Sequence, residues 1–408
     1  MLIEFTVGNY LSFKEKKTLS MEATAIKDNP GNVTEVGKYK LLRSAVIYGA
    51  NSSGKSNFIK AMSCMREIVI GSAKESSTSE LEVTPFLLST ETENRPTYFE
   101  ILLLIRDVRY RYGFETDKKN VHSEWLYSTA GSKEKLLFIR ERDSIEITEN
   151  FAEGVDLEER TRDNALFLSV VDQFNGSISK DIVEWFGEQI IFSGLDHEKE
   201  KNKTSLFLGN KHLNSSIKSF LSPLDLGFKD FTFDKLDKIN NRIITFHNKF
   251  DNEGNILEPS EFELQNQESS GTNKLFDIAG SLVGSLILGN MVIIDELDAK
   301  LHPLLTISII KLFNSPEQNL YNAQLIFATH DTNLLNKDLF RRDQIYFTEK
   351  NRFEETDLYS LAEYRDSSGK KARNDATYEK DYIAGRYGAI PYLGDFSKLI
   401  NDGEKGKD

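Results

Sequence analysis

The stretch Gly49-Ala50-Asn51-Ser52-Ser53-Gly54-Lys55-Ser56 fits the phosphate-loop pattern G-x-x-x-x-G-K-[ST]. A short apolar run at 44–48 precedes it and predicts a strand, and residues 56–70 carry apolar side chains at helical spacing. In this context the N–H groups of the loop and the start of the helix bind phosphate oxygens. We therefore predict a nucleotide site made by Gly49, Asn51, Ser52, Ser53, Gly54, Lys55, Ser56 and Asn57.

Two residues of this loop carry chemistry beyond phosphate binding. We expect the Lys55 ammonium to lie at the β- and γ-phosphates of ATP, and the Ser56 hydroxyl to coordinate Mg²⁺. The alternative is a Gly/Ser turn without a ligand. The strand before the loop and the helix after it disfavour that alternative.

A second apolar strand, 291–294, ends in the carboxylates Asp295 and Glu296. The carboxyl ends of parallel strands meet at one edge of a sheet, so this pair is predicted to lie beside the phosphate loop. We expect Asp295 to hold Mg²⁺ through water and Glu296 to act as general base on the attacking water. Without the phosphate loop, an exposed acidic pair at a strand end would be the better interpretation.

Three further motifs follow the order found in ABC ATPases. Thr329-His330 follows the strand 324–328, so the His330 imidazole is predicted to reach the γ-phosphate. Leu297-Asp298 resembles the D-loop, and Leu301-His302-Pro303 extends it. The turn Glu268-Ser269-Ser270-Gly271-Thr272 precedes a helix and resembles a divergent signature motif, a second anion site that caps the ATP of an opposite subunit.

Composition excludes several other classes of protein. The chain has 408 residues, a net charge of −13 and a single cysteine, Cys64, so an internal disulfide is impossible and a reducing cytoplasm is expected. The acidic balance argues against a uniformly basic nucleic-acid coat. The N-terminal stretch has no charged leader, and the apolar runs are of strand length, so we expect a soluble, cytoplasmic protein without membrane contact.

The motifs and the βα alternation around them predict an α/β fold of the ABC type. It comprises a mixed N-terminal β-lobe, a parallel core sheet flanked by helices, and a helical insertion, or arm. We divide the chain into four parts. These are the phosphate loop and β-lobe at 1–149, the helical arm at 150–266, the second half of the ATPase domain at 267–350, and a polar extension at 351–408.

Several longer stretches narrow the resemblance. They are IEFTVGNYLSFKEKKTLSM, IYGANSSGKSN, PTYFEILLLI, YRYGFE, ESSGTNKL, IIDELDAKLHP, FATHD and YIAGRYGAIPYL. Together they resemble the prokaryotic AAA/ABC ATPases of the overcoming-lysogenization-defect, RecF and SMC-like group. Within it they are most similar to the stand-alone anti-phage ATPases of the RloA/AbiL type and of the PARIS and Septu systems.

The chain departs from this group at two points. No glutamine occurs between Met1 and Asp172, so the Q-loop glutamine of transporters is missing from its usual place and hydrolysis is expected to be slow or regulated. The end of the chain also lacks the acidic cluster of the Toprim nuclease that longer relatives carry. Any cleavage of nucleic acid is therefore expected from a separate polypeptide.

The resemblance implies a head-to-tail homodimer, or a higher assembly of dimers, that buries two MgATP between phosphate loops and signature turns. The leading hypothesis is a sensor or scaffold that controls a separate nuclease or toxin effector in anti-phage defence. The alternative is a RecF/SMC-like ATPase of DNA repair or chromosome maintenance. A static structural role for ATP and a transporter role are less favoured, because Glu296 and His330 are present and the Q-loop is absent.

Two weaker expectations concern the ends of the chain. Related ATPases place an N-terminal turn near the adenine, which points to Phe13 and Lys14. The tail interleaves basic and aromatic residues, a pattern compatible with a nucleic-acid contact. A solvated or self-packing C-terminus is favoured instead, since such charge runs usually face water. The tail residues are Arg341, Arg342, Lys370, Lys371, Arg373, Arg386 and Tyr387.

Overall fold

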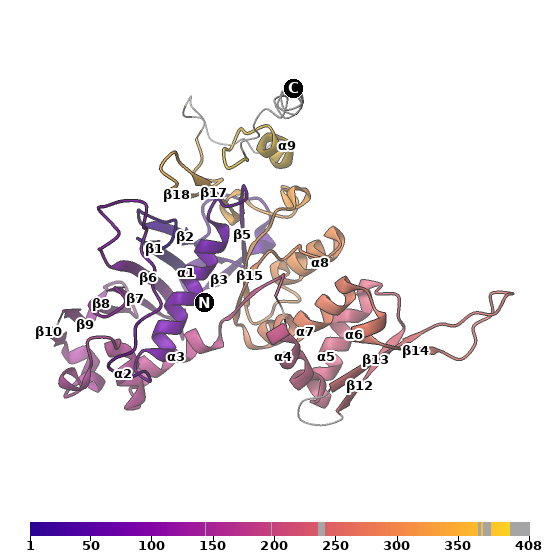
Figure 1. Cartoon of the computed structure of the whole chain (residues 1–408), viewed down its shortest axis with the longest axis horizontal. Helices are drawn as coiled ribbons and strands as arrows, with labels where there is room; N and C mark the ends of the chain where they lie inside the picture. The colour runs from indigo at the N-terminus through magenta and orange to yellow at the C-terminus, as the bar shows by residue number, and fades with distance from the viewer. Residues whose placement is uncertain (143, 197, 236–240, 366–368, 370–376, 392–408) are drawn as a thin grey trace, which may run out of the picture.

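The computed structural model describes residues 1–142, 144–196, 198–235, 241–365, 369 and 377–391. Two large sheets dominate it, with an arm extending from one side (Figure 1). No described helix is long and apolar enough to cross a membrane.

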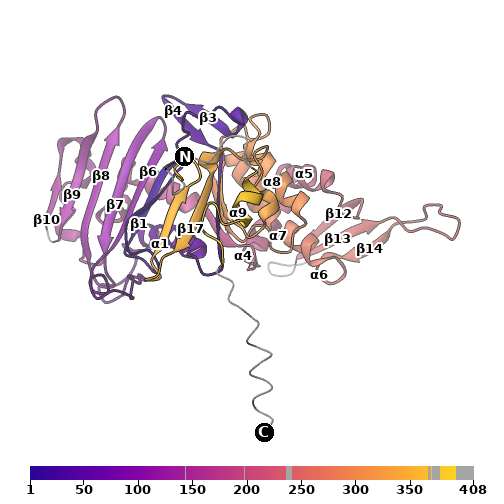
Figure 2. The ribbon, with the colours of Figure 1, turned by 90° about the horizontal axis from the view of Figure 1, so that it is seen from above.

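The N-terminal β-lobe is a seven-stranded antiparallel sheet. Its strand order is β10-β9-β8-β7-β6-β1-β2. The strands are β1 (Leu2–Gly8), β2 (Lys17–Ser20), β6 (Thr97–Ile105), β7 (Val108–Thr116), β8 (Val121–Thr129), β9 (Lys135–Glu141) and β10 (Ser144–Ile147). This sheet is the N-terminal β-lobe that the sequence predicts. A small hairpin of β3 (Val33–Val36) and β4 (Tyr39–Leu42) lies beside this sheet (Figure 2).

The core sheet has the order β11-β15-β16-β5-β17-β18. All its pairs are parallel except β17–β18. The strands are β5 (Ser44–Gly49), β11 (Ile190–Ser193), β15 (Met291–Asp295), β16 (Gln324–Ala328), β17 (Ile345–Lys350) and β18 (Thr356–Ser360). The predicted ABC-type α/β architecture, with its β-lobe and parallel core sheet, is confirmed.

Alternating side chains of β5 show how the core sheet is covered. Ala45 and Ile47 belong to the apolar cluster shared with the β-lobe and helix α1 (Lys55–Gly71). Val46 and Tyr48 belong to the cluster under α7 (Ser270–Leu288) and α8 (Pro303–Asn314). The central strand is thus buried on both faces, as its continuous apolar run requires.

The helices are α1 (Lys55–Gly71), α2 (Phe167–Gln173), α3 (Ser177–Glu188), α4 (Glu198–Leu208), α5 (Lys211–Leu221), α6 (Leu264–Gln267), α7 (Ser270–Leu288), α8 (Pro303–Asn314) and α9 (Tyr378–Ile383).

Short 3-10 helices connect several of these elements. They are η1 (Pro30–Asn32), η2 (Glu149–Gly154), η3 (Glu158–Arg160), η4 (Ser222–Leu224), η5 (Thr332–Leu334) and η6 (Arg342–Gln344).

The stretch 150–266, expected to be a helical arm, is organised differently. Helices α2 and α3 pack near α1, and β11 joins the core sheet beside β15. Residues 182–192 therefore span the end of α3 and the start of β11. A short apolar run such as Ile190–Ser193 fits a buried strand as well as a helix, so periodicity cannot decide between them.

The projecting part of the arm also contains a sheet. Helices α4 and α5 contact α7, and the antiparallel sheet β12 (Asp230–Lys235), β13 (Asn241–His247) and β14 (Ser260–Glu263) extends beyond them. We call these three strands the arm sheet. The expected helical arm therefore contains helices and also a sheet that was not expected, although Asp230-Phe231-Thr232-Phe233 alternates polar and apolar residues as a strand does.

Candidate functional site

The phosphate loop joins the end of β5 to the start of α1, as the motif requires. Ser52 and Gly54 have φ values of 63° and 114°, in the left-handed region. A Cβ at Gly54 would collide with the Thr356 side chain, so glycine is required there by space as well as by conformation. Asn51 and Ser52 are exposed, and Ser53 is buried.

Two threonines from the last strands of the core sheet hold this loop in place. The Thr348 hydroxyl lies 2.6 Å from that of Ser53. The Thr356 hydroxyl donates to the Ser53 carbonyl at 2.9 Å. The hydroxyl of Ser53 is thus engaged by the protein, and its N–H donates to the Ala50 carbonyl at 3.2 Å.

Lys55 is 5% exposed, and its ammonium donates to the carbonyls of Gly49 at 2.8 Å and Ala50 at 3.1 Å. Burial lowers the pKa of Lys55 to about 8, while the charges of nearby carboxylates oppose that shift. These carboxylates belong to Asp295, Glu296 and Asp298. The lysine of the phosphate loop and the acidic residues after β15 therefore share one electrostatic environment.

Strand pairing explains this proximity. β15 pairs with β16, and β16 pairs with β5, all in parallel, so their carboxyl ends lie at one edge of the sheet. One carboxylate oxygen each of Asp295 and Asp298 is buried without a hydrogen-bond partner in the protein. Such oxygens require a water or cation partner.

These orphaned oxygens fit a Mg²⁺ site. The hydroxyl of Ser56, the carboxylate of Asp295 and phosphate oxygens would make the all-oxygen ligand set that Mg²⁺ prefers. Among the described residues, no group of three or more His, Cys, Asp or Glu side chains is placed to hold a metal ion. The protein groups alone therefore do not form a metal cage, and phosphate oxygens are needed to complete one.

Glu296 begins a tight turn that also contains Leu297, Asp298 and Ala299, which we call the catalytic turn. Its φ of 55° is left-handed, an uncommon conformation for a residue with a side chain. Ala299 N–H donates to the Glu296 carbonyl at 3.1 Å, and Leu297 N–H donates to the carbonyl of Ala328 at 3.2 Å on the next strand. The turn is thus fixed by backbone bonds on two sides.

A lysine from the signature helix completes the support of this turn. Lys274 on α7 is fully buried, and its ammonium donates to the carbonyls of Leu297 at 2.9 Å and Ala299 at 2.6 Å. A longer contact of 3.5 Å reaches the Glu296 carbonyl. Burial lowers the pKa of Lys274 to about 8. A charge this deep is tolerated because carbonyl oxygens surround it.

His330 lies after β16, next to buried Thr329, and its side chain is exposed. Its pKa is lowered by partial burial and by the charge of Lys55, whereas Asp298, Glu296 and Asp295 oppose the shift. The structure thus brings His330 into the same environment as Lys55 and the carboxylates.

The signature turn opens helix α7. The Ser269 hydroxyl caps the helix by accepting from Thr272 N–H at 3.1 Å, and Ser269 and Ser270 are exposed. The preceding Glu268 binds the arm sheet, because its carboxylate lies 2.6 Å from the His247 ring nitrogen. The Thr245 hydroxyl donates to the same oxygen at 2.5 Å. The signature turn is therefore tied to the arm.

The N-terminal turn beside the phosphate loop corrects one prediction. Phe13 is fully buried against Phe58, with ring centroids 6.0 Å apart, so its ring is part of the core and the prediction that it approaches an adenine is wrong. Lys14 lies at the surface in ion pairs with Glu355 at 3.1 Å and Glu91 at 3.7 Å. Its role at the adenine stays a prediction.

The same turn supplies a contact that the sequence did not point to. Asn57, predicted to contact the nucleotide, donates from its side chain to the Ser12 hydroxyl at 2.8 Å.

The basic and aromatic tail residues that the structure describes pack against the protein. Arg341 is 2% exposed and paired with Asp343, and Tyr387 is 3% exposed. Arg386 forms an ion pair with Asp381. These contacts support a self-packing C-terminus over a nucleic-acid contact. Lys370, Lys371 and Arg373 lie outside the described residues.

A family model described as "AAA domain, putative AbiEii toxin, Type IV TA system" matches residues 44–336, which are 293 of the 408 residues. The chain belongs to this AAA-domain family. The matched region of the AAA-domain protein includes the phosphate loop, the signature turn, Asp295, Glu296 and His330. It is a P-loop ATPase of the AAA/ABC type.

Solved structures with a likeness to the AAA-domain protein include heads of SMC proteins. The SMC head domain from Thermotoga maritima is 12% identical with a TM-score of 0.42, and the match covers 88% of this chain and 98% of that chain. An SMC head bound to the C-terminal winged-helix domain of ScpA is 11% identical with a TM-score of 0.45, covering 88% and 97%.

A third is an SMC head with an extended coiled coil bound to the C-terminal domain of ScpA, derived from Pyrococcus furiosus. It is 11% identical with a TM-score of 0.40, covering 88% and 96%. None of the curated proteins matches the chain.

Proposed function

We propose that this protein binds MgATP at the phosphate loop and hydrolyses it slowly, with Glu296 as general base. One observation carries the proposal. The buried Lys55 ammonium lies in the electrostatic field of the Asp295, Glu296 and Asp298 carboxylates. Asp295 and Asp298 each keep one buried carboxylate oxygen without a hydrogen-bond partner. The buried ammonium can bind the phosphate oxygens of a triphosphate, and the carboxylate oxygens without a partner can bind its metal ion.

Each residue has a distinct role in this proposal. The Lys55 ammonium exchanges its carbonyl partners for phosphate oxygens, and Ser56 and Asp295 hold the Mg²⁺, which neutralises phosphate charge. Glu296 orients the attacking water and polarises it. His330 lies beside the γ-phosphate as a neutral donor, because partial burial and the charge of Lys55 lower its pKa.

The second half of the site would come from another copy of the chain. Ser269 and Ser270 are exposed at the start of α7, whose N–H groups form an anion site. In a head-to-tail dimer, this turn caps the ATP on the partner's phosphate loop. ATP binding closes the dimer and hydrolysis opens it, so the nucleotide acts as a conformational ligand.

We further propose that this cycle controls a separate nuclease or toxin effector in anti-phage defence. The support is the family description, which names a toxin and a toxin–antitoxin system. The link from the arm sheet to the signature turn through His247 and Glu268 gives the arm a route to the ATP site.

The alternative is a RecF/SMC-like ATPase that maintains DNA. ATP turnover stimulated at least about tenfold by plain or ended duplex DNA would favour this alternative.

Native mass spectrometry of tagged Glu296→Gln, purified with ATP from its own host, tests the proposal. Loss of a general base slows hydrolysis by about 10²–10⁴-fold, which traps the closed, ATP-bound assembly. The exposed Glu317→Gln serves as the matched control. A second polypeptide in fixed ratio supports the effector role, and a homo-oligomer carrying only DNA supports the alternative. A monomer without nucleotide overturns the composite site.

A further inference from the structure

The arm ends in a hairpin that projects from the body of the protein. Residues 248–259, here called the arm hairpin, connect β13 to β14 and extend beyond them at one end of the longest axis (Figure 1). Its backbone is ordered by bonds from Leu257 N–H to the Lys249 carbonyl at 2.7 Å and from Asp251 N–H to the Asn255 carbonyl at 3.1 Å.

Large apolar side chains lie exposed on this hairpin. Phe250 and Ile256 face each other in an isolated bridge and are 57% and 65% exposed, and Leu257 is 45% exposed. Three such side chains on one projecting element are more than scattered surface residues. They are typical of an interaction site.

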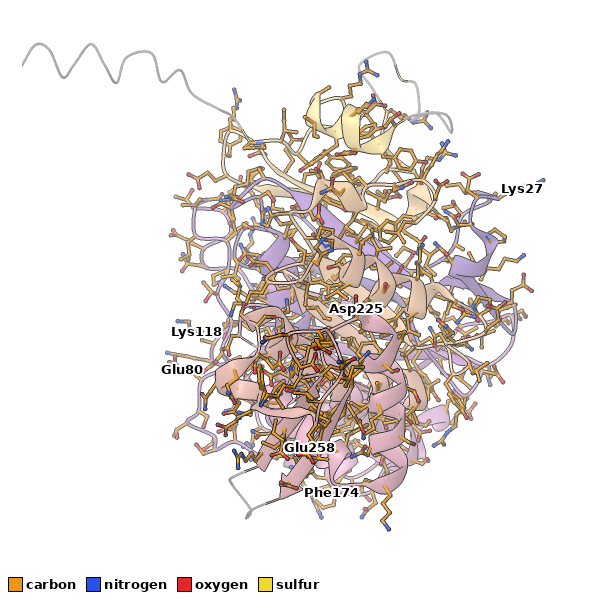
Figure 3. All side chains as sticks on the ribbon, turned by 90° about the vertical axis from the view of Figure 1, so that its right-hand side faces the viewer. Lys27, Glu80, Lys118, Phe174, Asp225 and Glu258 are labelled. Carbon is orange, nitrogen blue, oxygen red and sulfur yellow. The ribbon has the colours of Figure 1, made fainter. Side chains whose placement is uncertain are left out.

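The net charge of the residues around these apolar side chains indicates which class of partner the hairpin can bind. Residues 248–259 contain three carboxylates and one lysine, so their net charge is 1 − 3 = −2. Glu258, labelled in Figure 3, belongs to this acidic set on the side of the molecule that carries the arm. An acidic hairpin repels nucleic acid and anionic membranes. It fits a protein surface with an apolar floor and a basic rim.

The opposite end of the same chain offers such a surface. A pocket of about 590 Å³ lies in the β-lobe at strands β7 to β9, which we call the far-end pocket. Its floor includes the apolar side chains of Val108, Tyr110, Leu137 and Ile178, and Lys133 and Lys135 lie on its rim.

Both rim lysines are exposed, and neither forms an ion pair with any residue in the described part of the chain. The nearby Asp181 and Glu153 are already engaged. Asp181 pairs with Arg106 at 2.9 Å, and Glu153 accepts from Ile178 N–H at 3.0 Å and Ser179 N–H at 2.9 Å. Among the residues that line the pocket, Lys133 and Lys135 are the charged ones, so the lining itself carries positive charge.

We propose that the arm hairpin of one copy docks into the far-end pocket of a second copy of this chain. Phe250 and Ile256 enter the apolar pocket, and Glu253 and Glu258 pair with Lys133 and Lys135. The two surfaces lie at opposite ends of the molecule (Figures 1 and 2), so the contact is heterologous and generates a chain or a ring of subunits.

This contact is separate from the ATP site and does not depend on the proposed hydrolysis. A single hairpin inserted in one pocket buries less area than a standard interface, so the dissociation constant is expected in the micromolar range, about 1–100 µM.

Sedimentation velocity of the full chain, without nucleotide and with EDTA, measures the contact alone. The expected result is a mean mass that rises with concentration over this range. Phe250→Asp and Ile256→Asp should each weaken self-association by about tenfold or more, since a buried apolar anchor is replaced by a charge. The matched control is Leu320→Asp, a 69% exposed side chain on another surface, which should associate like the wild type. A wild-type protein that stays monomeric across this range overturns the proposal.

A charge exchange tests the pairing itself. Glu253→Lys/Glu258→Lys and Lys133→Glu/Lys135→Glu should each remain monomeric alone, because like charges then meet at every contact. Mixing the two variants pairs the altered hairpin with the altered pocket and should restore assembly. If both variants still self-associate, or if mixing restores nothing, the two surfaces do not bind each other. Failure of ATP hydrolysis leaves these results unchanged.

Discussion

The ammonium nitrogen of Lys274 lies 2.6 Å from the carbonyl oxygen of Ala299. This bond joins the first turns of the signature helix to the catalytic turn, which carries Glu296. This buried contact links the signature helix to the turn of Glu296, the proposed general base, within one subunit.

Lys274→Met removes the charged donor while keeping the length of the side chain. We expect nucleotide affinity to stay within about threefold and kcat to fall by about tenfold or more, because the direction of the Glu296 carboxylate is no longer fixed. Equilibrium binding of MgATP and single-turnover hydrolysis separate the two effects. Lys274→Arg should recover part of the rate.

Thr204→Val is the control for Lys274→Met. It removes hydrogen bonds to the same helix at Asp277 and Gly280, away from the catalytic turn. A normal kcat in Lys274→Met would show that the lysine only stabilises the fold.

Gly194 lies directly under the catalytic turn. A Cβ there would overlap the Glu296 carbonyl and lie 2.7 Å from the Lys274 nitrogen. Gly194→Ala should therefore displace the turn and lower kcat by about tenfold or more, with unfolding still cooperative. Gly187→Ala is the control, since a Cβ there meets nothing within 4 Å. Equal rates in both variants would mean that the turn adapts freely.

The pKa of Lys55 near 8 predicts proton uptake on nucleotide binding. The free lysine is partly neutral above this pH, and phosphate charge favours its protonated form, so binding should take up about 0.5 proton at pH 8 and about 0.9 at pH 9. Calorimetry in buffers of different ionisation enthalpy measures this number. Lys274→Met should retain the uptake. Binding without uptake at both pH values would show that Lys55 is already charged.

Arg341 and Asp343 form a buried ion pair at 2.8 Å, with both side chains no more than 3% exposed. Arg341→Met should lower the free energy of unfolding by about 3 kcal/mol, because it leaves a buried carboxylate without its cation. Lys350→Met, in the more exposed pair with Glu354, should change it by less than about 0.5 kcal/mol. Chemical denaturation compares the two. Similar losses would contradict the role of burial.

The sequence was sufficient for the centre of the fold because local signals agreed there. The glycine pattern of 49–56 sat between a predicted strand and a predicted helix, and Asp295 and Glu296 followed an apolar strand. Parallel strands place their carboxyl ends together, so the proximity of Lys55 to these carboxylates followed from motif order alone.

Other features depend on contacts between segments far apart in the chain. Nothing local distinguishes Lys274 from a surface lysine, and its burial results from the carbonyls of residues more than twenty positions away. The sequence also does not reveal that the Phe13 ring is buried, since the side chain of a turn residue can point toward the core or toward solvent. Part of the arm sheet does carry a local signal, since Asp230-Phe231-Thr232-Phe233 alternates polar and apolar residues as a strand does.

The strand order of the core sheet has a consequence for synthesis of the protein. β5, which precedes the phosphate loop, lies between β16 and β17, and both follow it by more than 270 residues. During translation, the N-terminal antiparallel lobe can form early, because its strands come from the first part of the chain. β5 cannot pair with β16 and β17 until both of these strands have left the ribosome. Such long-range closure slows folding and exposes an apolar strand. A nascent chain halted before residue 324 should therefore be a chaperone substrate, with no competence for nucleotide.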